Sequence, residues 1–441
     1  MLKEIESAVK KTEEEIKTEI QTGKRIKTVS KIIGPGVITG LSDDDPSGIG
    51  TYSIAGARFG LGLNWLASFQ LPLMIAIQEM CARLGLVTGR GLAGNIKQFL
   101  SRRWLYLAVF LLVIANTVNI GADIGAMAAS MKLVVGGNLV FWAIILTVII
   151  IVLEIFVSYR VYANILKWLG IFFFAYVLTA FLTPQNWSEV FLSLIKPKIQ
   201  FSREFLLTAV GFLGTTISPY LFFWQTSEEV EEEVAAGKIK EMGQKIKFVH
   251  PKEVKKMRWD TALGMIFSQV ITVFIVITCA ATLFKNGVID IDSAEKAASA
   301  LQPLAGDMAG WLFAIGIVAA GFLGIPVLAG SAAYAMSEAF GWREGLFHKF
   351  KEARGFYAVI AAATVVGLLI NFLGVNPIKA LLYAAVLNGL VAVPLIAFII
   401  ILANKKEVMG AQVNRWYSNL FGWLTFAVML LAVILLVLVR R

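Results

Sequence analysis

The sequence predicts an all-α protein that crosses a membrane many times and contains two five-helix repeats of opposite orientation. Of its 441 residues, 58% are hydrophobic and 16% are charged, and the mean hydropathy is +0.74. Soluble domains are far more polar than this. Apolar stretches of spanning length recur along the chain, and two of them are interrupted by glycine and proline at corresponding places.

The apolar stretches number about eleven if each must hold about 20 residues to cross the hydrocarbon core. In chain order they cover residues 32–60, 65–84, 105–131, 141–159, 166–182, 205–225, 261–284, 311–336, 356–373, 381–402 and 420–439. We expect an N-terminal arm at 1–31, one repeat at 32–183, and a second, inverted repeat at 205–404. A cytosolic loop at 227–258 interrupts the second repeat, and a linker with the eleventh span occupies 405–441.

Lysine and arginine predict the orientation, because cytosolic loops carry an excess of both. Every second loop is basic, with Lys24, Arg25 and Lys27, then Arg83, Arg90, Lys97, Arg102 and Arg103, and so on to Lys405, Lys406 and Arg415. We therefore expect a cytosolic N-terminus, without a signal peptide, and an extracellular C-terminus. Arg440 and Arg441 are exceptions to the pattern, because they place positive charge at the extracellular end. The net charge of +10 then reflects topology in a cell membrane. The sequence indicates neither a nucleic-acid partner nor an obligate protein partner.

The first span is broken by charge and proline. Three consecutive carboxylates, Asp43, Asp44 and Asp45, precede Pro46 inside an otherwise apolar run. Charge at the centre of a span is costly, and proline cannot continue a helix. A break at membrane depth must be buried in protein or line a cavity. Its carbonyls and carboxylates predict a bound cation.

The sixth span has the same kind of interruption, at residues 211–220 with a proline at Pro219. The two broken spans each open a group of five, and because five is odd the second group must be inverted. Paired interruptions of this kind indicate a transport site at the membrane midplane. The C-terminal carbonyls of the first half-helices would face that site, which again favours a cation.

Two further features have ordinary interpretations. The acidic run Glu228, Glu229, Glu231, Glu232 and Glu233 is either a mouth that attracts cations or a solvated extension of the sixth span, and the second interpretation is favoured. Cys81 and Cys279 lie inside apolar spans and are expected to be small buried hydrophobes. No HExxH, GxSxG or P-loop motif is present, so neither an enzyme nor a cofactor is expected.

Five ordered segments resemble the Nramp family of divalent metal transporters, over residues 33–423. Gly34-Pro35-Gly36 and Asp45-Pro46-Ser47-Gly48 resemble the start of the family's first span and its Asp-Pro-Gly-Asn motif. Residues 215–220 stand where the family has Ala-x-x-Met-Pro-His. Residues 82–89 and 402–410 resemble flanking segments. The resemblance implies a LeuT-like inverted-repeat fold and metal import by alternating access.

Three departures from the family pattern bear on the substrate. The aspartate is retained as Asp45, but Gly48, Ser218 and Tyr220 stand at the asparagine, methionine and histidine positions. A thioether favours Mn²⁺ and Fe²⁺, whereas Mg²⁺ takes hard oxygens and keeps several waters. The changed pattern resembles the branch of Nramp-related magnesium transporters. It implies transport of partly hydrated Mg²⁺, with Mn²⁺ also accepted.

The resemblance and the break together give a candidate metal site. Asp45 is the expected carboxylate ligand, and Asp44 is a second candidate. Because successive residues point in different directions, we expect one of Asp43 and Asp44 to face the outer vestibule and the other to cap the half-helix. Gly48 would leave room for the ion. Thr215 and Ser218, three residues apart and so on one helix face, either offer oxygens to the ion and its waters or let helices approach closely.

Proton coupling is expected to be weak or absent. The resembled family usually has two acidic residues on the third span, and Asn119 and Ala122 stand at those positions here. Asp123, one turn from Asn119, is the remaining acidic candidate. Tyr220 keeps its proton where a histidine would titrate.

Two other functions compete with magnesium import. The first is a proton-coupled Nramp transporter of Mn²⁺ or Fe²⁺, which the missing methionine and histidine disfavour. The second is a Na⁺-coupled transporter of an organic solute on the same fold. Three adjacent aspartates would repel the carboxylate of such a solute, so this function ranks last.

Overall fold

The computed structural model describes residues 34–157, 170–246 and 248–439. Every regular element in these ranges is helical, and nine stretches are long and apolar enough to cross a membrane. One of the nine, Pro46–Thr88, contains the end of the first expected span and all of the second. A shorter apolar stretch, Gly170–Leu182, belongs to the expected fifth span. The N-terminal arm and the pair Arg440 and Arg441 lie outside the described residues.

Both expected breaks are present. The first span divides into α2 (Pro35–Asp43) and α3 (Pro46–Phe59), and Asp44 between them has φ −87° and ψ 50°, which is not helical. The sixth divides into α11 (Arg203–Thr216) and α12 (Pro219–Ala235). Proline begins three of these four half-helices, because its fixed φ and missing N–H suit the first helical position.

The remaining long helices surround the broken pair. They are α4 (Asn64–Thr88), α6 (Arg102–Val135), α7 (Leu139–Phe156), α9 (Phe174–Leu182), α13 (Pro251–Thr282), α16 (Ala309–Phe340), α17 (Arg354–Ile370), α18 (Pro377–Asn404) and α20 (Trp416–Leu438). Short helices connect them: α5 (Leu92–Phe99), α10 (Trp187–Ile195), α14 (Ala294–Ala298), α15 (Gln302–Ala305) and α19 (Lys406–Met409).

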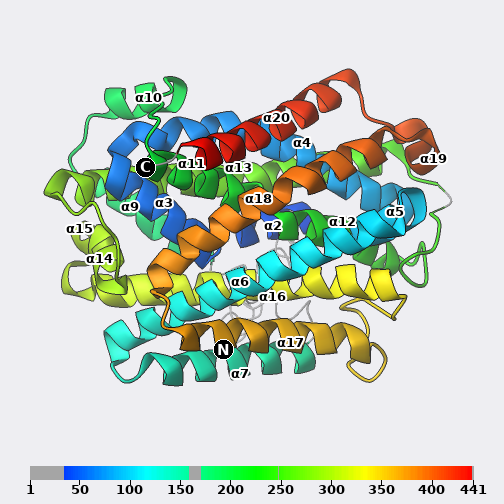
Figure 1. Ribbon diagram of the computed structural model, residues 1–441, viewed down its shortest axis with the longest axis horizontal. Helices are drawn as coiled ribbons and strands as arrows, with labels where there is room; N and C mark the ends of the chain where they lie inside the picture. Colours follow the sequence, from blue (N-terminus) through cyan, green and yellow to red (C-terminus); the bar gives the residue numbers. More distant parts are fainter. Residues whose placement is uncertain (1–33, 158–169, 247, 440–441) are drawn as a thin grey trace, which may run out of the picture.

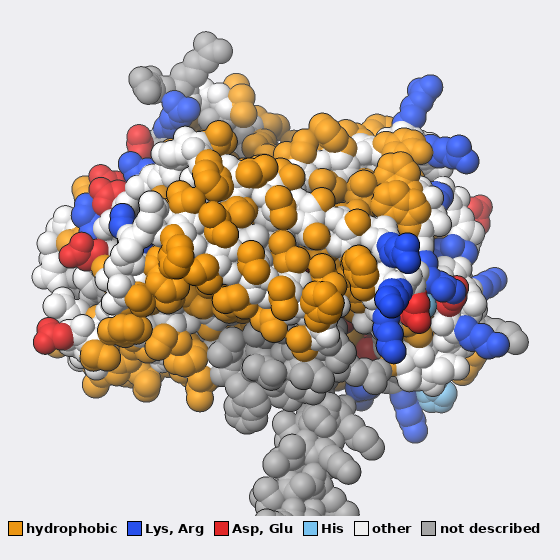
Figure 2. All heavy atoms as spheres, turned by 90° about the horizontal axis from the view of Figure 1, so that it is seen from below, with side chains coloured by type: hydrophobic (Ala, Val, Ile, Leu, Met, Phe, Trp, Pro, Cys, Tyr) orange, Lys and Arg blue, Asp and Glu red, His pale blue; other side chains and the backbone are white. Residues whose placement is uncertain are grey.

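Burial separates a centre from a periphery. In the most apolar window of each stretch, 89% of the residues are buried in Arg203–Ala235, but 22% in α7 and 17% in α20. Figure 1 shows α7 and α17 together along one edge and α20 along the opposite one. Hydrophobic side chains cover the middle of the face in Figure 2, and charged side chains gather toward its ends. This is the pattern of a protein surrounded by lipid.

Two expectations about charged residues were wrong. The acidic run belongs to α12, which extends the sixth span as expected, but Glu228, Glu229 and Glu233 are only 5–6% exposed and so are not solvated, whereas Glu232 is exposed. The expected loop 227–258 is correspondingly shorter, because α12 continues to Ala235 and α13 begins at Pro251. Arg83, assigned to a basic loop, lies inside α4 and is 1% exposed.

Candidate cation site

Asp45 is held at the start of α3 by its own helix. Its Oδ1 accepts a hydrogen bond of 2.7 Å from the Gly48 N–H, the usual bond of an aspartate that caps a helix N-terminus. The residue is 1% exposed. The Asp-Pro sequence therefore fixes one carboxylate oxygen on the backbone and leaves the other, Oδ2, for contacts with other helices.

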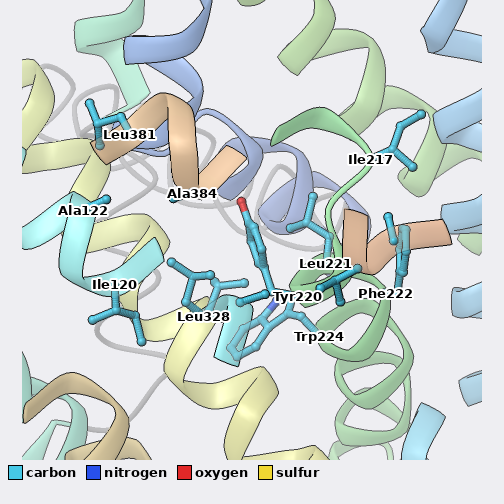
Figure 3. Close-up of a cluster of buried hydrophobic side chains, with 14 of the residues drawn as sticks. Ile120, Ala122, Ile217, Tyr220, Leu221, Phe222, Trp224, Leu328, Leu381 and Ala384 are labelled. Carbon is cyan, nitrogen blue, oxygen red and sulfur yellow. The ribbon is translucent and has the colours of Figure 1, made fainter. Parts of the chain in front are cut away.

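Two helices contact Asp45 Oδ2. Asn119 on α6 donates from Nδ2 across 3.0 Å, and the Tyr220 hydroxyl at the start of α12 lies 3.4 Å away. The same hydroxyl is 3.2 Å from the carbonyl oxygen of Ser42 in the last turn of α2. Figure 3 shows Tyr220 among buried apolar side chains, with its hydroxyl directed away from Trp224. The carboxylate thus connects both broken spans with α6.

Small residues make the close approaches around Asp45. A Cβ added at Gly48 would lie 3.1 Å from the carbonyl oxygen of Asp43 and 3.5 Å from Asp45 Oδ1. A Cβ added at Gly324 on α16 would lie 2.7 Å from the Cβ of Asp45. Gly48 therefore borders the carboxylate, and any larger residue at 324 would collide with Asp45 itself. The sequence reasoning missed Gly324, because glycine is common in membrane helices.

Asp43 and Asp44 do not share the contacts of Asp45. Asp43 Oδ2 accepts a 2.5 Å hydrogen bond from Ser268 on α13, and neither oxygen of Asp44 has a hydrogen-bond partner among the described residues. Both residues are 0% exposed. Asp43 is thus bound to α13, whereas Asp45 is bound to α6 and α12. The divergence agrees with the expectation that successive residues face different directions.

Ser218 and Thr215 lie at the second break, but their contacts are with their own chain segment. The Ser218 hydroxyl lies 2.8 Å from the Gly214 carbonyl and 2.5 Å from the Thr215 carbonyl. Within the described residues, no hydrogen bond joins either side chain to Asp45. Gly214 shows the close packing expected of small residues, because a Cβ there would lie 2.4 Å from the backbone nitrogen of Gly389 on α18.

Unsatisfied oxygens lie beside Asp45 on α6. Asn119 Oδ1 and both carboxylate oxygens of Asp123 have no hydrogen-bond partner among the described residues, and both residues are 0% exposed. Asp123 is within electrostatic reach of Asp45. Buried acceptors of this kind are costly unless a proton, water or cation satisfies them. Asn119 and Tyr220 were not expected among the site residues. The sequence marks Asn119 as a polar side chain in an apolar span, and it marks Tyr220 as a substitution at a motif position.

The described residues contain no group of three or more His, Cys, Asp and Glu side chains arranged to hold a metal. A cation at Asp45 would have the Asn119 amide, the Tyr220 hydroxyl and a second carboxylate, Asp123, nearby. Such ligands suit a hard, hydrated ion rather than a soft one.

Comparison with known proteins identifies the fold and its family. A sequence profile described as "Natural resistance-associated macrophage protein-like", or Nramp, matches residues 36–439. The chain belongs to the Nramp family. The divalent metal cation transporter MntH of Caldanaerobacter subterraneus subsp. tengcongensis is 24% identical over 429 residues, 92% of this chain and 94% of the relative. This relative is named as a transporter of divalent metal cations.

Solved structures support the same fold. The Eremococcus coleocola manganese transporter, in complex with an aromatic bis-isothiourea substituted compound, gives a TM-score of 0.71 at 18% identity over 90% of this chain and 84% of that one. MhsT in complex with L-phenylalanine gives 0.61 at 12% identity over 91% and 97%. At such identities the likeness establishes the fold alone. It confirms the expected all-helical, LeuT-like fold.

Proposed function

We propose that this Nramp protein imports divalent cations by alternating access and that its main substrate is partly hydrated Mg²⁺, with Mn²⁺ also accepted. The observation that supports this most directly is the set of atoms bonded to Asp45: a backbone N–H, the Asn119 amide and the Tyr220 hydroxyl. No sulfur or imidazole is among these partners. The Asp45 carboxylate, with the Asn119 amide, the Tyr220 hydroxyl and the nearby Asp123 carboxylate, offers hard oxygen ligands, which suit an ion that keeps part of its water shell.

In this proposal each residue at the break has a role. Asp45 is the direct carboxylate ligand, and the free Asn119 Oδ1 is a neutral ligand for the ion or its water. Gly48 leaves space beside the carboxylate. Thr215 and Ser218 offer backbone carbonyls from the end of α11, and Asp44 adds negative charge that attracts the ion to the break.

The membrane arrangement completes the proposal. The two five-helix repeats are 32–183 and 205–404, the N-terminus lies in the cytosol, and the C-terminus lies outside the cell. We expect weak or absent proton coupling because the two side chains that contact the Asp45 carboxylate do not exchange protons. Asn119 cannot titrate, and the Tyr220 phenol keeps its proton at physiological pH.

A second candidate, proton-coupled transport of Mn²⁺ or Fe²⁺, is favoured by one specific observation. Asp123 is a buried carboxylate without a hydrogen-bond partner among the described residues, within reach of Asp45. Such a group is suited to accept a proton. The similar Eremococcus coleocola protein is a manganese transporter, which points the same way.

Flux measurements in proteoliposomes test the proposal. We expect comparable uptake of Mg²⁺ and Mn²⁺ and rejection of the larger Ca²⁺, because the first two accept near-octahedral oxygen and water ligands. Mn²⁺ uptake that persists unchanged in millimolar Mg²⁺ would instead favour the transition-metal function. If none of the three ions enters faster than it enters empty liposomes, both functions are contradicted.

A further inference from the structure

The cytosolic half-helix α2 is capped by a side chain from a different helix. Asp260 on α13 accepts hydrogen bonds from the Gly34 N–H at 2.9 Å and from the Gly36 N–H at 2.7 Å. The residue at the helix boundary, Gly34, has no side chain with which to cap α2 itself. An aspartate more than 220 positions away in the sequence therefore satisfies two of the unpaired N–H groups at the start of α2.

Below this cap, α2 and α13 touch through their backbones. A Cβ added at Gly36 would lie 2.5 Å from Thr261 Cα, and one at Gly40 would lie 2.2 Å from the carbonyl oxygen of Gly264. A Cβ added at Gly264 would lie 2.0 Å from the carbonyl oxygen of Gly36. Glycine at these positions lets α2 rest directly on α13. A methyl group at Gly264 would have to push the half-helix away.

Helix α2 runs from a cavity at its first end to the break in the first span at its last turn. Its first end borders a cavity of about 270 Å³ whose lining includes Gly34, Pro35, Glu229 and Asp260. Its last turn reaches the break, where the Ser42 carbonyl meets the Tyr220 hydroxyl beside Asp45. The cavity is on the side of the positively charged loops, which the orientation proposed above places in the cytosol. Helix α2 thus separates Asp45 from the cavity.

We propose that Asp260 is a positioning residue for transport: it latches α2 to α13, and a cation passes from Asp45 to the acidic cavity only after both hydrogen bonds break. This inference rests on the proposed transport cycle, since it assigns a step within it. The carboxylate is required because each of its two oxygens accepts one N–H. In Asp260→Asn one oxygen becomes an NH₂ group, which faces a backbone donor and cannot accept its hydrogen bond.

Thiol accessibility tests the latch without measuring transport. Cys81 and Cys279 are fully buried and are first replaced by alanine, and Thr39→Cys then places a single thiol on the buried face of α2. Inside-out membrane vesicles are treated with a membrane-impermeant maleimide. We expect Asp260→Asn to speed labelling of this thiol about tenfold, because the charged hydrogen bonds that hold α2 are lost.

Two further variants separate the latch from a general loss of structure. Gly264→Ala leaves Asp260 intact but displaces α2 sterically, so we expect it to speed labelling as well. Asp292→Asn makes the same change at an exposed carboxylate in a loop outside α2 and α13, and it should leave the labelling rate unchanged. Labelling of Asp260→Asn at the parental rate would overturn the latch, whatever the rate in Gly264→Ala. Faster labelling in a protein that moves no divalent cation would keep the latch and refute the proposed substrate.

Discussion

The side-chain amide of Asn119 donates a hydrogen bond to Oδ2 of Asp45 across 3.0 Å, and so joins α6 to the break in the first span. Its own Oδ1 is left without a partner among the described residues. One neutral side chain can therefore orient the carboxylate and offer an oxygen ligand beside it. An acidic residue in the same place would add charge and a titratable proton, and asparagine adds neither.

The first prediction concerns the charge of Asp45. We expect Asp45→Asn to reduce Mg²⁺ flux to the level of empty liposomes while the protein stays folded. Asparagine is nearly as good a helix cap as aspartate, so α3 should form normally. The lost negative charge is the main compensation for dehydrating a divalent ion. The measurement is Mg²⁺ uptake by proteoliposomes, with monodispersity checked by size-exclusion chromatography.

Asp292→Asn is the matched control for this prediction, because it makes the same chemical change at a residue that pairs with Lys296 on the surface. It should transport like the parent protein. A monodisperse Asp45→Asn protein with normal Mg²⁺ uptake would show that the ion binds elsewhere.

Both breaks could be predicted because their cause is local. Proline cannot continue a helix, and the sequences around Pro46 and Pro219 place it after polar residues inside apolar spans. The contacts of Asp45 could not be predicted in this way. Asn119 and Tyr220 are 74 and 175 positions from it, and helical periodicity shows which face a residue occupies but not which residue it meets.

Charged residues near the membrane surface illustrate a second limit. Composition suggested that Glu228, Glu229 and Arg83 face water, because isolated charges rarely lie in a protein interior. Two of them have a partner one turn away on their own helix: Gln225 donates to Glu229, and Arg83 donates to Glu79. Both pairs are visible in the sequence at a spacing of four residues, but so are many pairs that never leave the surface. The fold adds Arg258, which also donates to Glu79 and which spacing could not predict.

The second prediction concerns metal selectivity at Ser218. We expect Ser218→Met to raise the ratio of Mn²⁺ to Mg²⁺ uptake about tenfold, because a thioether binds the transition metal and contributes little to Mg²⁺. Ser218→Leu supplies a side chain of similar size without sulfur and should leave the ratio unchanged. The measurement is competition between the two ions in proteoliposomes. Equal ratios in the methionine and leucine variants would mean that residue 218 does not contact the ion.

The third prediction concerns stability at the inner ends of α4 and α13. Arg83 is 1% exposed and donates to Glu79 through Nε at 2.8 Å and Nη2 at 3.0 Å, and Arg258 also donates to Glu79. Breaking a buried ion pair costs about 3–5 kcal/mol when the remaining charge has no other partner, and in Arg83→Ala the buried Glu79 keeps only the bond from Arg258, so we expect a cost below that range. We expect Arg83→Ala to lower the midpoint of thermal unfolding in detergent by at least about 5 °C.

Arg343→Ala is the control for Arg83, because Arg343 pairs with Glu241 while both side chains are about half exposed. Exposed pairs contribute at most about 1 kcal/mol. We therefore expect its midpoint to stay close to that of the parent protein. Equal midpoints for the two variants would show that the buried cluster around Glu79 does not stabilise the fold.

The fourth prediction concerns protons. Coupling requires a group in contact with the ion site that changes protonation at working pH. Tyr220 and Asn119, the side chains bonded to Asp45 Oδ2, keep their protonation state there, and Asp123 is the one unpaired carboxylate beside them on α6. We expect saturating Mg²⁺ to drive uptake with little or no acidification of the lumen, as reported by a trapped pH-sensitive dye, and Asp123→Asn to leave that signal unchanged. Acidification that scales with metal flux and disappears in Asp123→Asn would instead establish a proton path through α6. In that case the proton flux would depend on the Asp123 carboxylate, the side chain that the variant makes unable to titrate.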